Sequence, residues 1–148
     1  MYLRQSDLFA GLSHYFLKEV MNLAVRHAYD ADEMIFRDGD PADWFFILIS
    51  GHIQLRLDEI GRIVYASDRM GEAFGWSSLI GRRGYTATAV CLAPTVVLKI
   101  ERERFQQLLD GDEENGRLFY RHLSAALGRR LLELYRRLAE PESSVANT

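Results

Sequence analysis

Residues 70–90, MGEAFGWSSLIGRRGYTATAV, hold the richest set of groups in the chain for binding a small ligand. A glycine turn comes first, and a short helix expected over 77–80 would aim backbone N–H groups at an anion. Two arginines between glycines supply positive charge, and alternating threonine and alanine then predict a strand. The candidate ligand-binding residues are Phe74, Gly75, Trp76, Ser77, Ser78, Arg82, Arg83, Tyr85 and Thr86.

Composition limits the class of protein that carries this segment. The chain has 148 residues, 48% of them hydrophobic, which suits one folded domain. A formal net charge of −3 argues against non-specific binding to nucleic acid. The single cysteine, Cys91, lies in an apolar run and is expected to be a buried thiol. No apolar run is long enough to span a bilayer, so we expect a cytoplasmic protein that does not contact a membrane.

The elements that must position the candidate site are mainly strands. Helical spacing of apolar residues predicts a helix over 13–27, with Ser13 as its N-cap. Residues 44–49 are apolar on both faces, residues 53–57 alternate apolar and polar side chains, and so do residues 96–100. Short strands separated by Gly, Pro and Asp turns indicate an antiparallel sandwich or barrel, over about 28–104.

A long amphipathic helix is predicted over about 112–139. Its apolar stripe is longer than a small sandwich needs for cover, so part of it is expected to pair with a second copy of the chain. The alternative is that the helix folds back onto its own sheet. The arginines beside the stripe, Arg129 and Arg130 among them, are interpreted as a solvated helix face. Residues 141–148 are expected to be a disordered tail. The stripe consists of Leu123, Leu127, Leu131, Leu134 and Leu138.

These segments, in this order, resemble the cyclic-nucleotide-binding domain of the catabolite-activator-like (Crp/Fnr-type) bacterial regulators. The resemblance rests on DGDPAD followed by FILISG over 38–51, on GEAFG over 71–75, on TATAV over 86–90, and on LSA with RRL over 123–131. It implies a double-stranded β-helix, or jelly roll, with an N-terminal helix and a long C-terminal dimerisation helix. It covers about residues 8–139, so residues 1–140 are interpreted as one sensor domain.

The printed sequence leaves no room after the long helix for the helix-turn-helix of such regulators, so direct DNA binding by this chain is not expected. The chain is either a sensor alone or part of a longer regulator.

The resemblance also shows where this chain departs from the family's phosphate-binding cassette. Trp76 stands where the family has the glutamate that binds the ribose, and Tyr85 stands where it has the arginine that binds the phosphate. The matches to the base-contacting hydroxyl residues are Leu134 and Tyr135, so that contact is at best partly kept. Trp76 and Tyr85 either fill a vacated pocket or line a pocket for a flatter, less charged ligand. Arg82 or Arg83, most plausibly Arg83, is the candidate replacement for the missing arginine; otherwise both face solvent.

Other chemistries find little support in the sequence. The four histidines, His14, His27, His52 and His122, form no paired ligand set for a metal or a haem. No G-x-S-x-G elbow surrounds the serines, and Glu72 is expected to brace the glycine turn.

We therefore predict a non-enzymatic, homodimeric ligand-sensing domain without tight cyclic AMP binding, whose ligand is a cyclic nucleotide or another small anionic or aromatic molecule. The alternatives are a ligand-free interaction module with a plugged pocket and, as the weakest, a metal-dependent enzyme of the cupin type.

Overall fold

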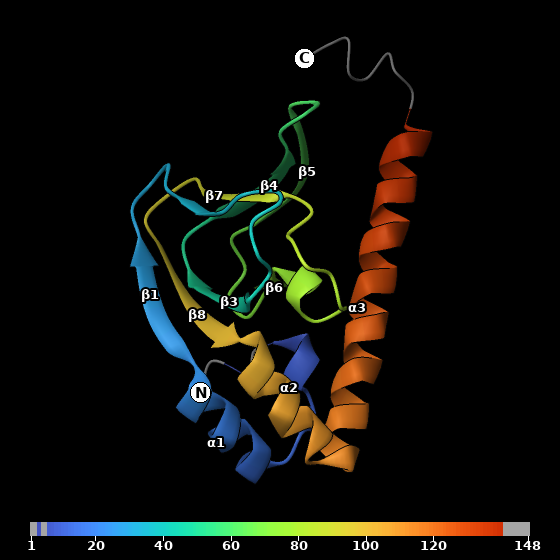
Figure 1. Ribbon diagram of the computed structural model, residues 1–148. Helices are drawn as coiled ribbons and strands as arrows, with labels where there is room; N and C mark the ends of the chain where they lie inside the picture. Colours follow the sequence, from blue (N-terminus) through green and yellow to red (C-terminus); the bar gives the residue numbers. More distant parts are fainter. Residues whose placement is uncertain (1–2, 4–5, 141–148) are drawn as a thin grey trace.

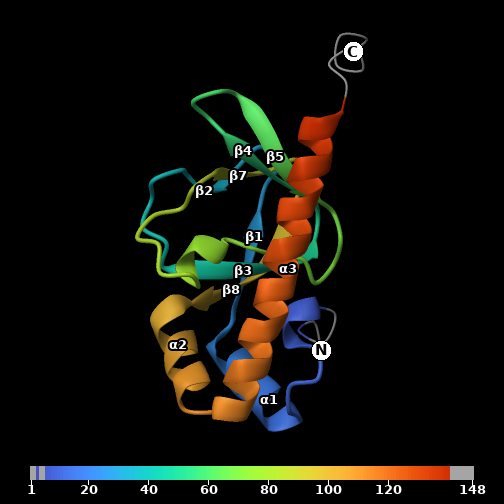
Figure 2. The same cartoon turned by 90° about the vertical axis from the view of Figure 1, so that its right-hand side faces the viewer.

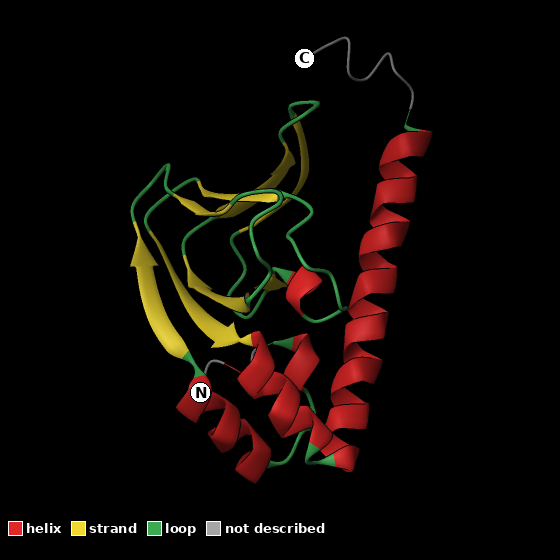
Figure 3. Ribbon diagram, viewed as in Figure 1, coloured by secondary structure: helices red, strands yellow, loops and turns green. Residues whose placement is uncertain are grey.

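The computed structural model describes Leu3 and residues 6–140, which include all of the predicted elements except the tail at 141–148. The protein is mainly β, with helices gathered at one end and one long helix along the side of the sheets (Figures 1 and 3). Two four-stranded antiparallel sheets face each other, with strand orders β1-β8-β3-β6 and β2-β7-β4-β5. The jelly roll that the sequence predicts is therefore confirmed.

The strands match the apolar patterns of the sequence. β3 (Trp44–Ser50) is buried through its centre, as its continuous apolar run predicts. β4 (Ile53–Leu57) buries Ile53 and Leu55 on one face and forms a hairpin with β5 through a turn at Gly61. The remaining strands are β1 (Val25–Tyr29), β2 (Met34–Phe36), β5 (Arg62–Ser67), β6 (Ala73–Phe74), β7 (Thr88–Cys91) and β8 (Thr95–Glu101).

The N-terminal helix is shorter than its sequence pattern indicates. A short 3₁₀ helix, η2 (Asp7–Phe9), precedes α1, which runs over His14–Leu23. Ser13 caps α1 by accepting a hydrogen bond from the backbone N–H of Phe16 at 3.2 Å, as predicted. The predicted end at residue 27 is wrong, because residues 25–29 pair along β8 as strand β1. Strand pairing overrides the helical spacing at this boundary.

Two helices follow the roll at its C-terminal end. The helix α2 (Arg102–Asp110) is not among the predicted elements, because only two of its side chains, Phe105 and Leu109, are buried. The long helix α3 (Glu113–Ala139) agrees with the predicted 112–139, and Asp112 caps it by accepting from the backbone N–H of Asn115 at 3.1 Å. Figure 2 shows α3 crossing the roll from the helical end, near α1, past the strands.

The helices and the roll share a core of aromatic side chains. Phe105 of α2 lies at its centre, with ring centroids 4.9 Å from Phe45 of β3 and 5.0 Å from Phe119 of α3. Phe9 of η2 packs on both Phe105 and Phe119. This cluster fixes the first half of α3 against the roll. Cys91 is buried in β7, as predicted.

Candidate ligand-binding site

The backbone of the predicted cassette is present. β6 ends at Phe74, and Gly75 then turns the chain with φ at +78° into a one-turn 3₁₀ helix, η3 (Trp76–Ser78). The predicted helix at 77–80 thus begins one residue earlier and ends at Ser78. A Cβ on Gly75 would lie 2.9 Å from Cδ2 of Phe46, so both the left-handed backbone and the close packing require glycine here.

Tyr85 does not plug the cassette. Its side chain is buried, and its ring stacks on Phe36 with centroids 3.8 Å apart. Its hydroxyl donates to the carbonyl of Trp44 at 2.5 Å and accepts from the Trp44 backbone N–H at 3.2 Å. Tyr85, which the resemblance places where the family has its arginine, therefore belongs to the aromatic core, and only part of it lines the cavity beside η3.

Because Tyr85 is buried, ionisation of its phenol should change the stability of the fold at alkaline pH. Burial raises the pKa of Tyr85 from its ordinary 10.0 to about 12. Between pH 10 and 12 the unfolded state therefore loses the phenol proton while the folded state keeps it, so stability falls as the pH rises. We expect this titration to remove about 1–2 kcal/mol of stability by pH 12.

The variant Tyr85→Phe tests this titration. Urea unfolding at pH 8, 10 and 11.5 should show a smaller alkaline loss of stability for the variant than for the wild type. Tyr29 and Tyr65, whose pKa values are also raised by burial, titrate in both proteins and cancel in the difference. Equal losses in the two proteins would contradict the buried position of the phenol.

Trp76 forms a stack with two other side chains. The guanidinium carbon of Arg130, from α3, lies 4.1 Å from the Trp76 ring centroid and 3.5 Å from that of Tyr65, from β5. Nη2 of Arg130 donates to the carbonyl of Ala73 at 3.2 Å. Two cation–π contacts in a partly buried position favour this arrangement over a hydrated arginine. Trp76 is therefore one wall of the site, and Arg130 rests on it.

The interpretation of Arg130 as a solvent-facing residue is wrong. Its side chain is only 20% exposed, whereas that of Arg129 is 61% exposed. The sequence does contain a signal, because Arg130 follows the buried Leu123 and Ala126 by seven and four residues and so lies on the same helix face. Because Arg130 is charged, a pattern of apolar residues alone does not predict that its side chain lies on the buried face.

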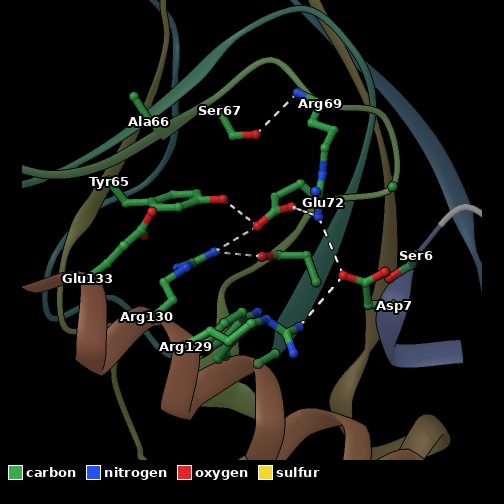
Figure 4. Close-up of a pocket in the computed structure, with 14 residues that line it drawn as sticks. Ser6, Asp7, Tyr65, Ala66, Ser67, Arg69, Glu72, Arg129, Arg130 and Glu133 are labelled. Carbon is green, nitrogen blue, oxygen red and sulfur yellow. Dashed lines mark hydrogen bonds and ion pairs between the residues drawn. The ribbon is translucent and has the colours of Figure 1, made fainter.

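Glu72 ties the roll to α3, which is a wider role than bracing the glycine turn (Figure 4). Its carboxylate accepts from the Tyr65 hydroxyl, and it pairs with Arg69 at 3.0 Å and with Arg130 at 3.4 Å. Burial, followed by the hydrogen bond to Glu72, raises the pKa of Tyr65. Asp7 of η2 continues the network to Arg69 and Arg129. These residues line a polar cavity of about 340 Å³ on one side of the Tyr65–Arg130–Trp76 stack.

An open groove lies between α3 and the roll. Two cavities of about 180 and 270 Å³ adjoin along it and share the lining residues Leu55, Thr86, Ala87 and Arg130. The smaller one reaches η3, where Oγ of Ser77 and Oγ1 of Thr86 lie 3.4 Å apart. The larger one continues along α3 to Leu134. The groove is mostly apolar, with a few hydroxyls and one shared positive charge.

The structure brings together five of the nine predicted site residues. Phe74 is fully buried, and Oγ of Ser78 donates to the carbonyl of Gly75 at 2.9 Å, so neither lines the groove. Arg82 and Arg83 are exposed and line a surface hollow beside Gly39, which shares Tyr85 and Thr86 with the groove. Neither arginine lines the groove itself, and a role for either of them at a ligand phosphate stays a prediction. The groove residues are Gly75, Trp76, Ser77, Tyr85 and Thr86.

The leucine stripe of α3 divides into two parts. Leu123 is buried in the chain's own core, and Leu127 is partly buried against it. From residue 131 onward the leucines are exposed: Leu131 by 48%, Leu134 by 39% and Leu138 by 79%. Leu134 faces the groove as well. Tyr135 is 56% exposed and does not line the groove.

Among the residues that the structure describes, no group of three or more His, Cys, Asp and Glu side chains is placed to hold a metal ion. Over the same residues, no helix combines the length and the hydrophobicity that crossing a membrane requires.

The chain is similar to known proteins both in sequence and in fold. The cyclic nucleotide-binding domain family matches residues 26–112. The cGMP-dependent protein kinase egl-4 of Caenorhabditis elegans is 30% identical over 118 residues, and the alignment covers 77% of this chain and 15% of the kinase. The cAMP-dependent protein kinase regulatory subunit of Yarrowia lipolytica is 27% identical over 113 residues, with 76% of this chain and 29% of that protein covered. The chain thus spans less than a third of the length of these relatives.

Solved structures give the same result. A cyclic nucleotide-binding protein from Geobacter metallireducens, so described in its crystal structure, has a TM-score of 0.77 at 26% identity, over 87% of this chain and 95% of that one. The catabolite activator protein of Thermus thermophilus has a TM-score of 0.73 at 29% identity, over 90% of this chain and 62% of that one. Because the family match spans more than half of its residues and the fold agrees, the chain belongs to the cyclic nucleotide-binding domain family.

Proposed function

We propose that this chain is a non-enzymatic regulatory domain that binds a small ligand in the groove between α3 and the roll, and that it does not bind cyclic AMP tightly. The observation that carries the proposal is the open groove. Both charged cassette positions hold large aromatic residues, yet cavities of about 180 and 270 Å³ remain, because Tyr85 is buried in the core and Trp76 lies under Arg130. A module whose pocket is plugged is therefore the less favoured candidate.

Weak cyclic AMP binding follows from the missing charge. A charge-assisted hydrogen bond contributes about 1.5–3 kcal/mol, and 1.4 kcal/mol changes an affinity tenfold. Without a cassette arginine, a buried phosphate loses two such bonds, which weakens binding by about 100-fold or more. Arg130 is already held by Glu72 and the Ala73 carbonyl, so moving it to the cassette would break both contacts. Calorimetric titration with cyclic AMP and cyclic GMP tests the proposal.

Pairing of two chains through α3 is the second part of the proposal. The exposed residues Leu131, Leu132, Tyr135 and Leu138 extend an apolar surface over the last two turns and more of the helix. Gly128 lies next to this surface, and among the described residues a Cβ there would meet no atom within 4 Å beyond the backbone of its own helix, which leaves room for a partner helix. A ligand in the groove would contact Leu134 on the same helix, so it would bias how two copies pack. A cytoplasmic location stays a prediction.

Substituting the exposed leucines tests this pairing. We expect the wild type to sediment as a dimer at tens of micromolar and the variant Leu131→Lys with Leu138→Lys to sediment as a monomer, since two charges would be buried at a symmetric interface. Leu92→Lys is the matched control, because Leu92 is 42% exposed on the turn between β7 and β8. A monomeric wild type, or a dimeric double variant, would contradict pairing through this surface.

A further inference from the structure

Aromatic rings line the part of the groove beside η3. The cavity of about 180 Å³ there is lined by Phe36, Trp76 and Tyr85, and the rings of Phe36 and Tyr85 stack with centroids 3.8 Å apart. Aliphatic side chains add to this wall, Leu55 and Leu127 among them. An aromatic guest gains from ring-to-ring contacts beyond the burial of its apolar surface, and an apolar cavity of about 150 Å³ is large enough to hold benzene. The size and lining of this cavity therefore suit a single aromatic ring.

The charges around the groove are balanced. Arg130, the one charged residue among the described residues that line the smaller cavity, pairs with the carboxylate of Glu72 at 3.4 Å. The larger cavity adds Glu133 and Arg137, which have opposite charges. Arg69, the second partner of Glu72, lines neither cavity and also pairs with a carboxylate of η2. A charged ligand would lose its water without gaining a free counter-charge, so the groove favours an uncharged ligand.

Two hydroxyl groups supply polar contacts in the smaller cavity. Oγ of Ser77 and Oγ1 of Thr86 lie 3.4 Å apart, and neither has another hydrogen-bond partner among residues 3 and 6–140. The polar groups of the neighbouring rings do not serve a ligand, because the Tyr85 hydroxyl bonds to the Trp44 carbonyl and the indole N–H of Trp76 is covered by protein atoms. A hydroxyl both donates and accepts. One neutral polar group on the ligand, such as an amide or a hydroxyl, would therefore find partners here.

We propose that the groove binds an uncharged ligand with a single aromatic ring and one neutral polar group. The ring would lie in the cavity beside η3, against Phe36 and Trp76, and the polar group would bond to Ser77 and Thr86. Larger substituents would extend along the cavity of about 270 Å³ towards Leu134. This inference rests on the proposed function and names the ligand class for that groove. It differs from the family resemblance, which implies a charged phosphate held by the cassette.

Three probes of nearly the same shape test the charge preference. At neutral pH benzamide is uncharged, benzoate is negative and benzamidine is positive, and each is titrated into the full chain by calorimetry. We expect benzamide to bind at least about tenfold more tightly than either ion, since an ion would be desolvated without a counter-charge. Equal or tighter binding of either ion would overturn the uncharged class.

A fourth probe tests the preference for an aromatic ring. Cyclohexanecarboxamide carries the same amide as benzamide on a saturated ring. It should bind at least about threefold more weakly than benzamide, because it makes no ring-to-ring contacts. Equal or tighter binding of the saturated amide would overturn the aromatic class.

Variants test whether benzamide binds in this groove. Ala87 lines both cavities, so Ala87→Phe would fill the space where they meet and should weaken binding at least about tenfold. Ala28→Phe is the matched control and should bind like the wild type, because Ala28 is exposed on β1 and lines neither cavity. Ser77→Ala with Thr86→Val removes the two hydroxyls and should weaken binding about fivefold, which keeps the test valid if Ala87→Phe folds poorly.

The outcomes separate this inference from the function on which it rests. If benzamide does not bind at about 10 mM, or if Ala28→Phe loses as much as Ala87→Phe, the inference is overturned. Binding of benzamide only to the variant Leu131→Lys with Leu138→Lys would mean that a second copy of the chain fills the groove, and this too would overturn the inference. The proposed groove is tested separately by the gain of cyclic AMP binding when charged cassette residues are restored. A gain there with no benzamide binding in the wild type would reject only the ligand class.

Discussion

Cyclic AMP should bind at least about 100-fold more tightly to a chain carrying Trp76→Glu together with Tyr85→Arg than to the wild type. The change restores the two charged groups that the family resemblance implies, a carboxylate for the ribose hydroxyl and a guanidinium for the phosphate. The new Glu at position 76 would also face Arg130, which now rests on Trp76. Calorimetric titration of both proteins measures the gain.

The loss of Tyr85 from the core makes a second variant necessary. Tyr85 stacks on Phe36 and bonds to Trp44, so an arginine there costs stability. Trp76→Glu with Thr86→Arg keeps Tyr85 in place, because Thr86 is exposed and lines the same groove. Trp76→Gln with Tyr85→Met is the uncharged control and should show no gain. If both charged pairs fold and neither binds cyclic AMP better than this control, the cassette is not where we place it.

The second large effect concerns the joint between the helices and the roll. We expect Phe105→Ala to lower the free energy of unfolding by about 3–5 kcal/mol. Phe105 is fully buried and contacts aromatic rings of η2, β3 and α3, so the truncation opens a cavity where four elements meet. The loss would be a large share of the stability of a typical domain, about 5–15 kcal/mol.

Urea unfolding followed by circular dichroism measures this loss. Phe105→Leu is the matched control, since it keeps most of the apolar volume and should cost less than about 2 kcal/mol. A loss below about 1 kcal/mol for Phe105→Ala would show that the site collapses around the smaller side chain and that Phe105 does not anchor α2 and α3.

Patterns with a clear period made the fold predictable. The alternation at Ile53 and Leu55 marks a half-buried strand, the apolar run at 44–49 marks a strand covered on both faces, and Ser13 caps α1 as predicted. The sequence does not predict α2, because Phe105 and Leu109 are its only buried residues and one i, i+4 pair is too weak a pattern. The end of α1 was misplaced because pairing with β8, a distant segment, decides the conformation of residues 25–29.

The candidate site was predictable in its location and less so in its chemistry. The glycine turn and the short helix lie where the order of motifs indicates. Tertiary packing decides where a side chain points, so the sequence alone does not predict the positions of Tyr85 and Arg130. Tyr85 enters the core because Phe36 offers a stacking partner, and Arg130 enters the site because Tyr65 and Trp76 offer their ring faces. Neither set of ring contacts can be predicted from the sequence, because the residues that form it lie far apart along the chain.

Titration of the wild-type chain with cyclic AMP and cyclic GMP, by calorimetry up to millimolar nucleotide, tests the central claim most directly. An open groove without a cassette arginine predicts dissociation constants of about 1 mM or weaker for both nucleotides. Micromolar or tighter binding would contradict the account. It would mean that Arg130, Arg82 or Arg83 moves to the phosphate and that the aromatic replacements at positions 76 and 85 leave the family's ligand site intact.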